Sequence, residues 1–243
     1  MISYVIYFLA SHADITRKLR DEIIQAYGTN GQPSIEDMKD LKYCMLHFIH
    51  SPVPLLNYKL LQVRAVINET MRLFPPVPLN IRQANGGLHA FPASENSPKY
   101  YVPPNSVILY TIFLIQRRKD LWGEDALDFR PERWLEPDCA KRLADNPFMY
   151  TPFHAGPRLV SRIYYLHVNA ADFIQCLGQN FAYSEMSVFL ILVMQRFERF
   201  ELAPDAQPGG SLPPPRWKHG RGRQAIEKIW PASALTAFIK VHL

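Results

Sequence analysis

The sequence contains little cysteine and glycine, and its net charge is small. Its three cysteines, Cys44, Cys139 and Cys176, form no C-x-x-C pair and leave one thiol unpaired in any disulfide scheme. This argues against a zinc site and against a secreted disulfide framework, and it favours a reducing compartment. Lys and Arg total 27 against 22 Asp and Glu, so the net charge is only +5, and the basic residues are dispersed. Such a balance does not by itself indicate nucleic-acid binding.

Long apolar runs and internal repeats are also missing. The apolar segment Met1–Ala10 runs directly into Ser11–Asp14, so it is too short to cross a bilayer and is typical of the end of a buried helix. No repeat with a period of about 20 to 50 residues occurs, which argues against a solenoid fold. With 243 residues, of which 48% are hydrophobic and 20% charged, the chain has the composition of a globular protein with a packed core.

Hydrophobic periodicity predicts helices in the first third of the chain and near its C-terminal end. Apolar residues at helical spacing follow Asp14, which we expect to cap a helix that ends at Gly28. Ser34–Asp37 is typical of a capping box that opens another helix. Val63–Leu73 keeps helical periodicity up to a Pro-Pro pair, and Ala182–Phe197 shows the same pattern.

Between these helices the pattern changes to short β-type runs. Leu79–Ile81, Tyr100–Val102 and Val107–Ile115 are separated by Gly and Pro pairs and predict a small antiparallel sheet. Trp122–Phe153 is rich in proline and aromatic residues and predicts an ordered meander rather than a helix, while Pro204–Arg223 predicts a loop. The predicted fold class is therefore mainly α with a small antiparallel β-sheet.

Three motifs carry the functional information. Glu69 and Arg72 lie at i and i+3 on one helix face, where they can pair with each other and with a third charged group. Phe129–Trp134 (FRPERW) brings another arginine into a proline-stiffened aromatic segment. Phe153–Arg158 (FHAGPR) is followed by Cys176–Ala182 (CLGQNFA), which begins a helix. Taken alone, an E-x-x-R pair is most often a surface ion pair, and a lone cysteine is most often a buried, inert thiol.

In this order the motifs resemble the cytochrome P450 family, whose signature is E-x-x-R, then P-E-R-[FW], then F-x-x-G-x-R-x-C-x-G before a final long helix. The stretches Asn68–Arg82, Arg117–Trp134 and Leu202–Ile229 look most like the fungal members related to alkane and fatty-acid hydroxylases. The resemblance implies the C-terminal part of the cytochrome P450 fold, with residues 1–243 as a single partial domain.

The resemblance also implies a haem site. Cys176 corresponds to the thiolate ligand of the haem iron, and a position just ahead of a helix suits a thiolate because backbone N–H groups stabilise the anion. Arg158 and Arg82 resemble the arginines that contact haem propionates. Phe153 and Gly178 belong to the same cofactor-binding motif, and the neighbouring histidine is given no ligand role.

Glu69, Arg72 and Arg133 resemble the structural ion-pair triad of the family, so no catalytic residue is assigned. The resemblance implies haem b as cofactor, with O2, a lipophilic small molecule and NADPH–cytochrome P450 reductase as partners and no nucleic acid. The implied reaction inserts one oxygen atom into the substrate. The parent protein is expected at the cytoplasmic face of the endoplasmic reticulum membrane, and this chain is expected to lack the membrane anchor of the parent. The alternative is a truncated, catalytically inactive fragment that binds haem weakly or not at all.

Two stretches interrupt the resemblance. Residues 160–175 stand between Arg158 and Cys176, where the family has a single residue, and their removal leaves the matching run GPRLCLGQNFA. Residues 44–63 likewise interrupt a run that the family reads continuously into the E-x-x-R helix. The possible codons at both boundaries allow splice signals, so we interpret the two stretches as retained introns translated in frame. Genuine insertions are the alternative, and sequencing of the mature transcript separates the two.

The sequence also lacks the A-G-x-[DE]-T-[TS] run that precedes this region in the family. We therefore expect the N-terminal half of the parent, with its oxygen-activating helix, to be absent. Apolar residues such as Val5, Tyr7 and Leu9 are then expected to be exposed, because the helices meant to cover them are missing.

Overall fold

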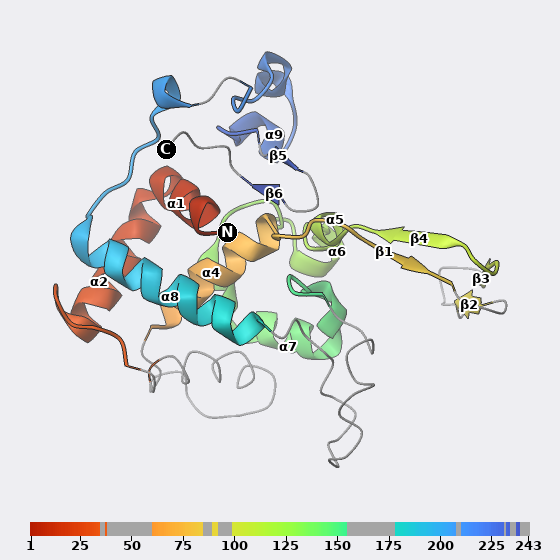
Figure 1. The fold of residues 1–243 in the computed structure, drawn as a ribbon, viewed down its shortest axis with the longest axis horizontal. Helices are drawn as coiled ribbons and strands as arrows, with labels where there is room; N and C mark the ends of the chain where they lie inside the picture. The colour runs from red at the N-terminus through yellow and green to blue at the C-terminus, as the bar shows by residue number, and fades with distance from the viewer. Residues whose placement is uncertain are drawn as a thin grey trace, which may run out of the picture.

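The computed structural model shows a helical body from which a β arm and a C-terminal segment extend (Figure 1). The body is built from α1 (Ile2–Ser11), α2 (Ala13–Tyr27), α4 (Leu61–Leu73) and α8 (Gln179–Arg196). The residues that the structure describes are 1–34, 37, 60–84, 89–91, 99–154, 178–207, 210–230, 232–233 and 237–238. Within these ranges, no helix is both long and apolar enough to cross a membrane.

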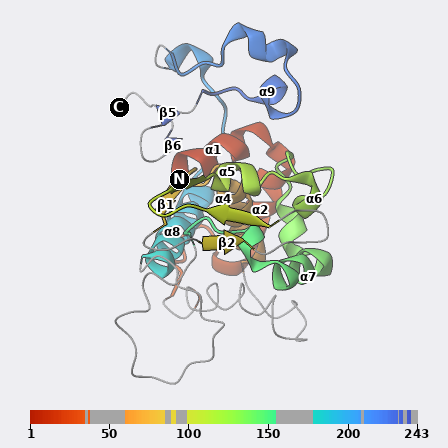
Figure 2. The ribbon, with the colours of Figure 1, turned by 90° about the vertical axis from the view of Figure 1, so that its right-hand side faces the viewer.

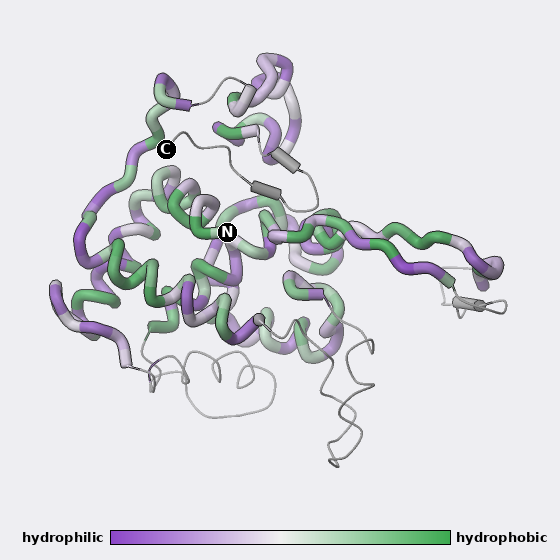
Figure 3. Tube along the Cα trace, viewed as in Figure 1, coloured by the Kyte–Doolittle hydropathy of each residue, from purple (hydrophilic) through white to green (hydrophobic). Residues whose placement is uncertain are grey.

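Three two-stranded antiparallel sheets are described. β1 (Asn80–Gln83) pairs with β4 (Val107–Tyr110), and these two strands form the arm that leaves the body in Figure 1. The other pairs are β2 (His89–Phe91) with β3 (Tyr100–Val102), and β5 (Ala232–Ser233) with β6 (Ala237–Phe238). β4 is hydrophobic whereas β1 is mainly hydrophilic (Figure 3). The predicted fold class, mainly α with small antiparallel sheets, is confirmed.

Short helices connect the arm to the body and form the C-terminal segment. They are α5 (Ile112–Ile115), α6 (Lys119–Trp122), η2 (Pro131–Leu135), α7 (Pro137–Asp145), η3 (Pro147–Met149), η5 (Pro204–Ala206), η6 (Pro215–His219) and α9 (Arg223–Ile226). Viewed from the side, the C-terminal segment lies over α1, away from α7 (Figure 2). The segment contacts α1 directly, since Tyr7 of α1 donates to Glu227.

α4 is the central helix, and every residue from Val63 to Leu73 is buried. It packs against η2, α8, α1 and α2. Its N-terminus is capped from α2, because the Glu22 carboxylate accepts the backbone N–H groups of Gln62, at 3.0 and 3.1 Å, and of Val63, at 3.3 Å. Burial raises the pKa of Glu22, and these N–H bonds partly offset the rise. A helix buried on all sides must satisfy every polar group that it carries, and α4 carries several.

Several predicted elements are confirmed. Ser34 and Asp37 form a reciprocal capping box, since Ser34 N donates to Asp37 Oδ2 at 2.8 Å and Asp37 N donates to Ser34 Oγ at 3.1 Å. Gly28 ends α2 with a positive φ of 64°, which suits glycine. The predicted helices before the Pro-Pro pair and near the C-terminal end are α4 and α8.

Three predicted details are wrong. Asp14 does not cap α2, because His12 is the N-cap residue and Asp14 lies in the first turn. Ile112–Ile115, the last part of the predicted strand Val107–Ile115, forms the helix α5. A run of four apolar residues is too uniform for its hydrophobic periodicity to distinguish a helix from a strand. The predicted meander contains α7, which begins with Pro137 at its first helical position and buries Cys139 and Leu143, an i, i+4 pair.

Val5, Tyr7 and Leu9 are buried, which corrects the expectation that α1 exposes them. They belong to the main core together with residues of α2, α4 and α8. The C-terminal segment also contributes, because Ile229 lies in the same core and Tyr7 Oη donates to Glu227 Oε2 at 2.5 Å. The fold therefore closes over α1 with its own C-terminal residues.

The two predicted insertions fall largely outside the described residues. Residues 160–175 lie outside them entirely, and of residues 44–63 only 60–63 are described. Leu60 and Val63 are buried in the main core, and residues 61–63 form the first turn of α4. The assignment of both stretches as insertions, and of residues 1–243 as one partial domain, stays a prediction.

Candidate functional site

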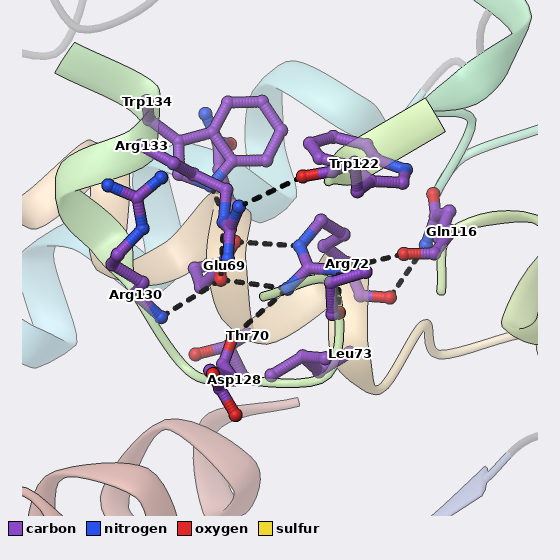
Figure 4. Close-up of polar contacts among 12 residues, drawn as sticks. Glu69, Thr70, Arg72, Leu73, Gln116, Trp122, Asp128, Arg130, Arg133 and Trp134 are labelled. Atoms are coloured by element: carbon purple, nitrogen blue, oxygen red, sulfur yellow. Dashed lines mark hydrogen bonds and ion pairs between the residues drawn. The ribbon is translucent and has the colours of Figure 1, made fainter. Parts of the chain in front are cut away.

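Glu69 is the centre of a buried network at the junction of α4, η2 and the segment that follows α6 (Figure 4). Its side chain is fully buried. Oε1 accepts from Arg72 Nη2 at 2.9 Å, from Arg133 Nε at 2.9 Å and from the backbone N–H of Arg130 at 3.0 Å. Oε2 accepts from Arg72 Nε at 2.8 Å and from Trp134 Nε1 at 2.9 Å. One carboxylate thus collects five donors, from α4, from η2 and from the N-cap residue of η2.

Arg72 uses all five of its N–H groups. Two of them form the bidentate pair with Glu69, one turn earlier on α4. The others donate to backbone carbonyls of Gln116 at 2.9 Å, Ala126 at 2.6 Å and Asp128 at 3.1 Å. Because those carbonyls lie on a segment far from α4 in sequence, the guanidinium fixes residues 116–128 to the central helix.

Arg133 joins the network from η2. Besides Glu69, its guanidinium contacts Asp125 Oδ1 at 3.1 Å and the Asp125 carbonyl at 2.9 Å. Beside the network, the rings of Trp122, Trp134 and Tyr150 contact one another in tilted and edge-to-face arrangements, with centroid separations between 4.6 and 6.2 Å. These rings shield one side of the ion pairs from water.

The charges of this network stabilise one another. Burial alone raises the pKa of Glu69, but the attraction of Arg72, its hydrogen bonds, Arg133 and the Arg130 N–H together hold that pKa below its ordinary value. For Arg133, burial lowers the pKa and the Glu69 and Asp125 carboxylates more than offset it, so the pKa is raised. Glu69 and Arg133 are therefore charged at neutral pH, and every N–H group of Arg72 has an acceptor. The arrangement suits a structural role.

Gln116 extends the network toward Phe153. Its amide Nε2 donates to the carbonyls of Met71 and Arg72, both at 3.1 Å, at the end of α4. Its Oε1 accepts from the backbone N–H of Thr151 at 3.0 Å. The residue is fully buried, so this one amide holds the segment before Phe153 in register with α4.

The predicted cofactor-binding residues are described in part. Phe153 packs against Tyr183 of α8, with the ring centroids 5.3 Å apart. Gly178 is the N-cap residue of α8, so Cys176 stands two residues before this N-cap in sequence. Arg82 is a half-buried residue of β1. Arg158 and Cys176 lie outside the described residues, and the assignments of all five stay predictions.

The structure also brings together two residues that sequence reasoning missed. Asn80 of β1 and His154 are hydrogen-bonded, with 3.2 Å between Asn80 Nδ2 and His154 Nδ1. His154 has a positive φ of 62°, and its N–H donates to Thr151 O at 3.0 Å in a turn. No local signal links positions 74 residues apart, although a histidine next to the cofactor motif was visible in the sequence.

Cys139 behaves as an ordinary core thiol. It is buried beneath the tryptophan pair, and burial first, then the charge of Glu69, raises its pKa to about 11. A thiol with such a pKa is a poor ligand and a poor nucleophile at neutral pH. Over the described ranges, no group of three or more His, Cys, Asp and Glu side chains is placed to hold a metal ion.

Comparison with known proteins places these features in one family. The cytochrome P450 family model matches residues 57–217. The chain is 31% identical to cytochrome P450 52A6 of Candida tropicalis over 223 residues, which cover 90% of this chain and 35% of the relative. It is 31% identical to cytochrome P450 52-M1 of Starmerella bombicola over 206 residues, covering 84% and 31% of the two chains. The chain spans about a third of the length of the curated relatives that it matches.

Proposed function

The chain belongs to the cytochrome P450 family, as its three motifs predict, and from this premise we propose that it is the C-terminal portion of a haem-thiolate monooxygenase. The reaction would insert one atom of O2 into a lipophilic organic substrate. The observation that supports this most directly is the Glu69 network, because three predicted motif residues from two distant segments meet in one fully hydrogen-bonded cluster. The matched region also spans both parts of the predicted haem motif.

We propose Cys176 as the ligand of the haem iron. The N-cap residue of α8, Gly178, follows it by two positions, so the positive end of an 18-residue helix begins next to this thiol in sequence. Such a position lowers the pKa of a cysteine and favours the thiolate, in contrast with Cys139 in the core. A bound iron porphyrin with a thiolate ligand supplies the chemistry that cleaves the O–O bond and oxidises C–H bonds.

The described residues fit a porphyrin with two carboxylates. Arg82 is a half-buried guanidinium that forms no ion pair with any described carboxylate, and Arg158 would be a second arginine of this kind. Phe153 is held against α8 by Tyr183, and Gln116 holds the segment before it to α4. In this proposal the ion-pair network fixes residues 116–154 relative to α4. The start of the cofactor loop is thereby held in a defined position.

Substrate and partners are proposed from the resemblance to fungal alkane and fatty-acid hydroxylases. An alkane or fatty-acid chain is the substrate class that we propose for the parent, with NADPH–cytochrome P450 reductase as electron donor and the endoplasmic reticulum membrane as its location. The relatives reported above are all named cytochromes P450 and come from fungi, which supports this origin.

A reduced carbon-monoxide difference spectrum of the purified chain after addition of haem tests the proposal. We expect a Soret band characteristic of thiolate ligation, and we expect the Cys176→Ser variant to lose it while a Cys139→Ser variant keeps it. Haem uptake with a spectrum that is unchanged by Cys176→Ser would show that this cysteine is not the ligand.

A second candidate, a fragment without haem, is favoured by one observation. Residues 159–175 separate Arg158 from Cys176, whereas the family motif has one residue there. A variant that lacks residues 160–175 restores the family spacing and is the matched comparison. Haem uptake by this variant but not by the unmodified chain would assign the loss of binding to the extra residues. Uptake by neither would favour the inactive fragment.

A further inference from the structure

The net positive charge of the chain is concentrated in residues 211–230, which we call the basic loop. The basic loop contains five Lys and Arg residues but a single acidic residue, Glu227, so its net charge is +4. The whole chain has a net charge of only +5. The rest of the chain is therefore almost neutral, and an anionic partner would be attracted mainly to this loop.

Buried groups hold the basic loop on the body. The backbone N–H of Trp230 donates to Ser211 O at 2.7 Å and so closes the loop at its base. Arg223 and Glu227 are buried and pair with each other, and Arg223 Nη1 donates to Leu127 O at 2.8 Å. The loop lies over α1, at the end of the molecule away from α7 (Figure 2). Its exposed side chains are therefore presented in a fixed arrangement.

Four cations of the basic loop are exposed. None of them forms an ion pair with a carboxylate in the described part of the chain. Exposed cations elsewhere, such as Lys18 and Lys119, do have carboxylate partners. The loop thus offers positive charge that the described residues leave uncompensated. The four residues are Arg216, Lys218, Arg221 and Lys228.

Apolar side chains lie among these cations. Leu212, Ile226 and Trp230 are 51%, 52% and 37% exposed. The ring of Trp230 contacts that of Trp217, with 4.9 Å between the centroids, although the two lie near opposite ends of the loop. Both sequence neighbours of Trp217 are exposed cations. The ring contact therefore brings positive charge from one part of the loop next to apolar surface from the other.

This combination is complementary to an anionic membrane surface. Anionic headgroups attract Lys and Arg, and indole rings enter the headgroup region because they join an apolar body to an N–H donor. A nucleic acid also attracts cations, but its bases need aromatic faces on which to stack. In the basic loop the two indole rings contact each other, and the exposed Leu212 and Ile226 have no counterpart in a phosphate backbone. The observations favour the membrane.

We propose that the basic loop binds the surface of a membrane that contains anionic phospholipids. Its four exposed cations contact the charged headgroups, while Trp217, Trp230 and the two exposed aliphatic side chains enter the headgroup region. The contact is peripheral and uses no membrane-spanning helix. It goes beyond the proposed function, because it requires neither haem nor a substrate.

Flotation with lipid vesicles tests the basic loop. The full chain is mixed with vesicles of phosphatidylcholine, or of phosphatidylcholine with about one quarter phosphatidylserine, and is centrifuged in a density gradient, so that aggregates sink and vesicle-bound protein rises. We expect much tighter binding to the anionic vesicles, and we expect added salt to weaken it because salt screens the attraction. Equal binding to both kinds of vesicle, or binding to neither, would overturn the proposal.

Two double variants with the same change in net charge locate the surface. Arg216→Gln with Lys218→Gln removes two cations from the loop, and at about fivefold per residue the affinity for anionic vesicles should fall about 25-fold. Arg118→Gln with Lys119→Gln removes two exposed cations at α6 and should change the affinity less than about twofold. Equal losses would show that overall charge, and not the loop, attracts the vesicles, and the proposal would be wrong.

Fluorescence quenching reports whether the indole rings enter the lipid. Trp217→Phe with Trp230→Phe keeps both side chains aromatic. With brominated phospholipid in the anionic vesicles, the fluorescence of the unsubstituted chain should be quenched and that of this variant should not, because the remaining Trp122 and Trp134 are only 2% and 5% exposed. Equal quenching of the two proteins would contradict insertion of the loop.

The remaining outcomes separate this inference from its alternatives. Salt-sensitive binding to a DNA duplex without binding to either kind of vesicle would assign the loop to nucleic acid and overturn the proposal. Circular dichroism reports whether each variant folds, and Arg221→Gln with Lys228→Gln replaces the first loop variant if that one does not. A chain that binds anionic vesicles but no haem would retain this inference and lose the proposed function.

Discussion

Arg72 and Arg82 lie close together in sequence but in opposite electrostatic surroundings. Arg72 is fully buried on α4, and each of its five N–H groups has an acceptor, two of them on the Glu69 carboxylate. Arg82 is half-buried on β1 and donates to one carbonyl of its own strand. A buried guanidinium that the protein itself satisfies has no capacity left for a ligand, whereas one that has no carboxylate partner in the described part of the chain keeps its charge available. The comparison separates a residue that holds the fold from one that we propose faces a ligand.

The largest expected effect comes from breaking the satisfied side of this comparison. Glu69→Ala leaves two arginines, Arg72 and Arg133, without their shared buried counter-charge, and removal of one partner from a buried ion pair costs about 3–5 kcal/mol. The free energy of unfolding, measured by urea denaturation followed by circular dichroism, should fall by that amount, or the variant should fail to fold.

Glu132 provides the control within the same motif. It pairs with Lys18 at 2.8 Å, but both side chains are substantially exposed, so Glu132→Gln should cost less than about 1 kcal/mol. Similar losses in the free energy of unfolding for Glu69→Ala and Glu132→Gln would show that burial does not distinguish the two carboxylates. The contrast between a buried, fully paired charge and a more exposed one would then have no basis.

Acid should act on the same network without a mutation. The folded-state pKa of Glu69 is lower than its ordinary value of 4.5, so its carboxylate contributes stability that is fully present above pH 4.5 and is lost as the pH falls through the folded-state pKa. The stability difference between the wild type and Glu69→Gln should therefore be constant from pH 7 to about pH 5 and shrink at lower pH. A difference that stays constant down to pH 3 would contradict the lowered pKa.

Gln116 should give the next largest effect. Gln116→Ala removes an amide that satisfies two carbonyls at the end of α4 and the Thr151 N–H, and a buried group left without its partner costs about 1–3 kcal/mol. In hydrogen-exchange measurements, the Thr151 amide should lose protection. Its exchange should increase relative to amides in the middle of α2, which Gln116 does not contact. Equal increases at both places would indicate general destabilisation instead of a local role.

The sequence was informative where a residue type and a short spacing both had a physical meaning. Glu69 and Arg72 are one helical turn apart, and Arg133 lies in a motif that is recognisable by itself, so the triad could be predicted and is formed. Gln116 and Asn80 could not be found, because their partners lie 44 and 74 residues away and an isolated amide carries no local signal. α7 was missed despite a usable signal, since Pro137 after an acidic residue is typical of a helix start.

The covering of α1 was mispredicted for the same reason. Tyr7 was expected to be exposed, but it lies in the main core, and its hydroxyl contacts Glu227, 220 residues later in the chain. Neither the helical period of α1 nor the loop composition of the C-terminal segment contains that information. The contact forms only when the C-terminal segment folds back onto the body. Arg223 supports this arrangement, because it pairs with Glu227 and donates to Leu127 O at 2.8 Å.

The smallest expected effect compares two tyrosines one turn apart on α1. Tyr7 Oη donates to Glu227 at 2.5 Å and accepts the Lys228 N–H at 3.0 Å, whereas the equally buried Tyr4 Oη has no hydrogen-bond partner among the described residues. Tyr7→Phe should cost about 1–2 kcal/mol and increase hydrogen exchange at Lys228, because the Glu227 carboxylate loses one of its two donors and the Lys228 amide loses its acceptor. Tyr4→Phe keeps the ring stacked on Phe74 and removes only an unsatisfied hydroxyl, so it should be neutral or stabilising. Equal costs for the two variants would show that ring packing, and not the hydroxyl, holds the C-terminal segment on α1. The distinction between satisfied and unsatisfied polar groups, drawn from Arg72 and Arg82, would then not extend to uncharged side chains.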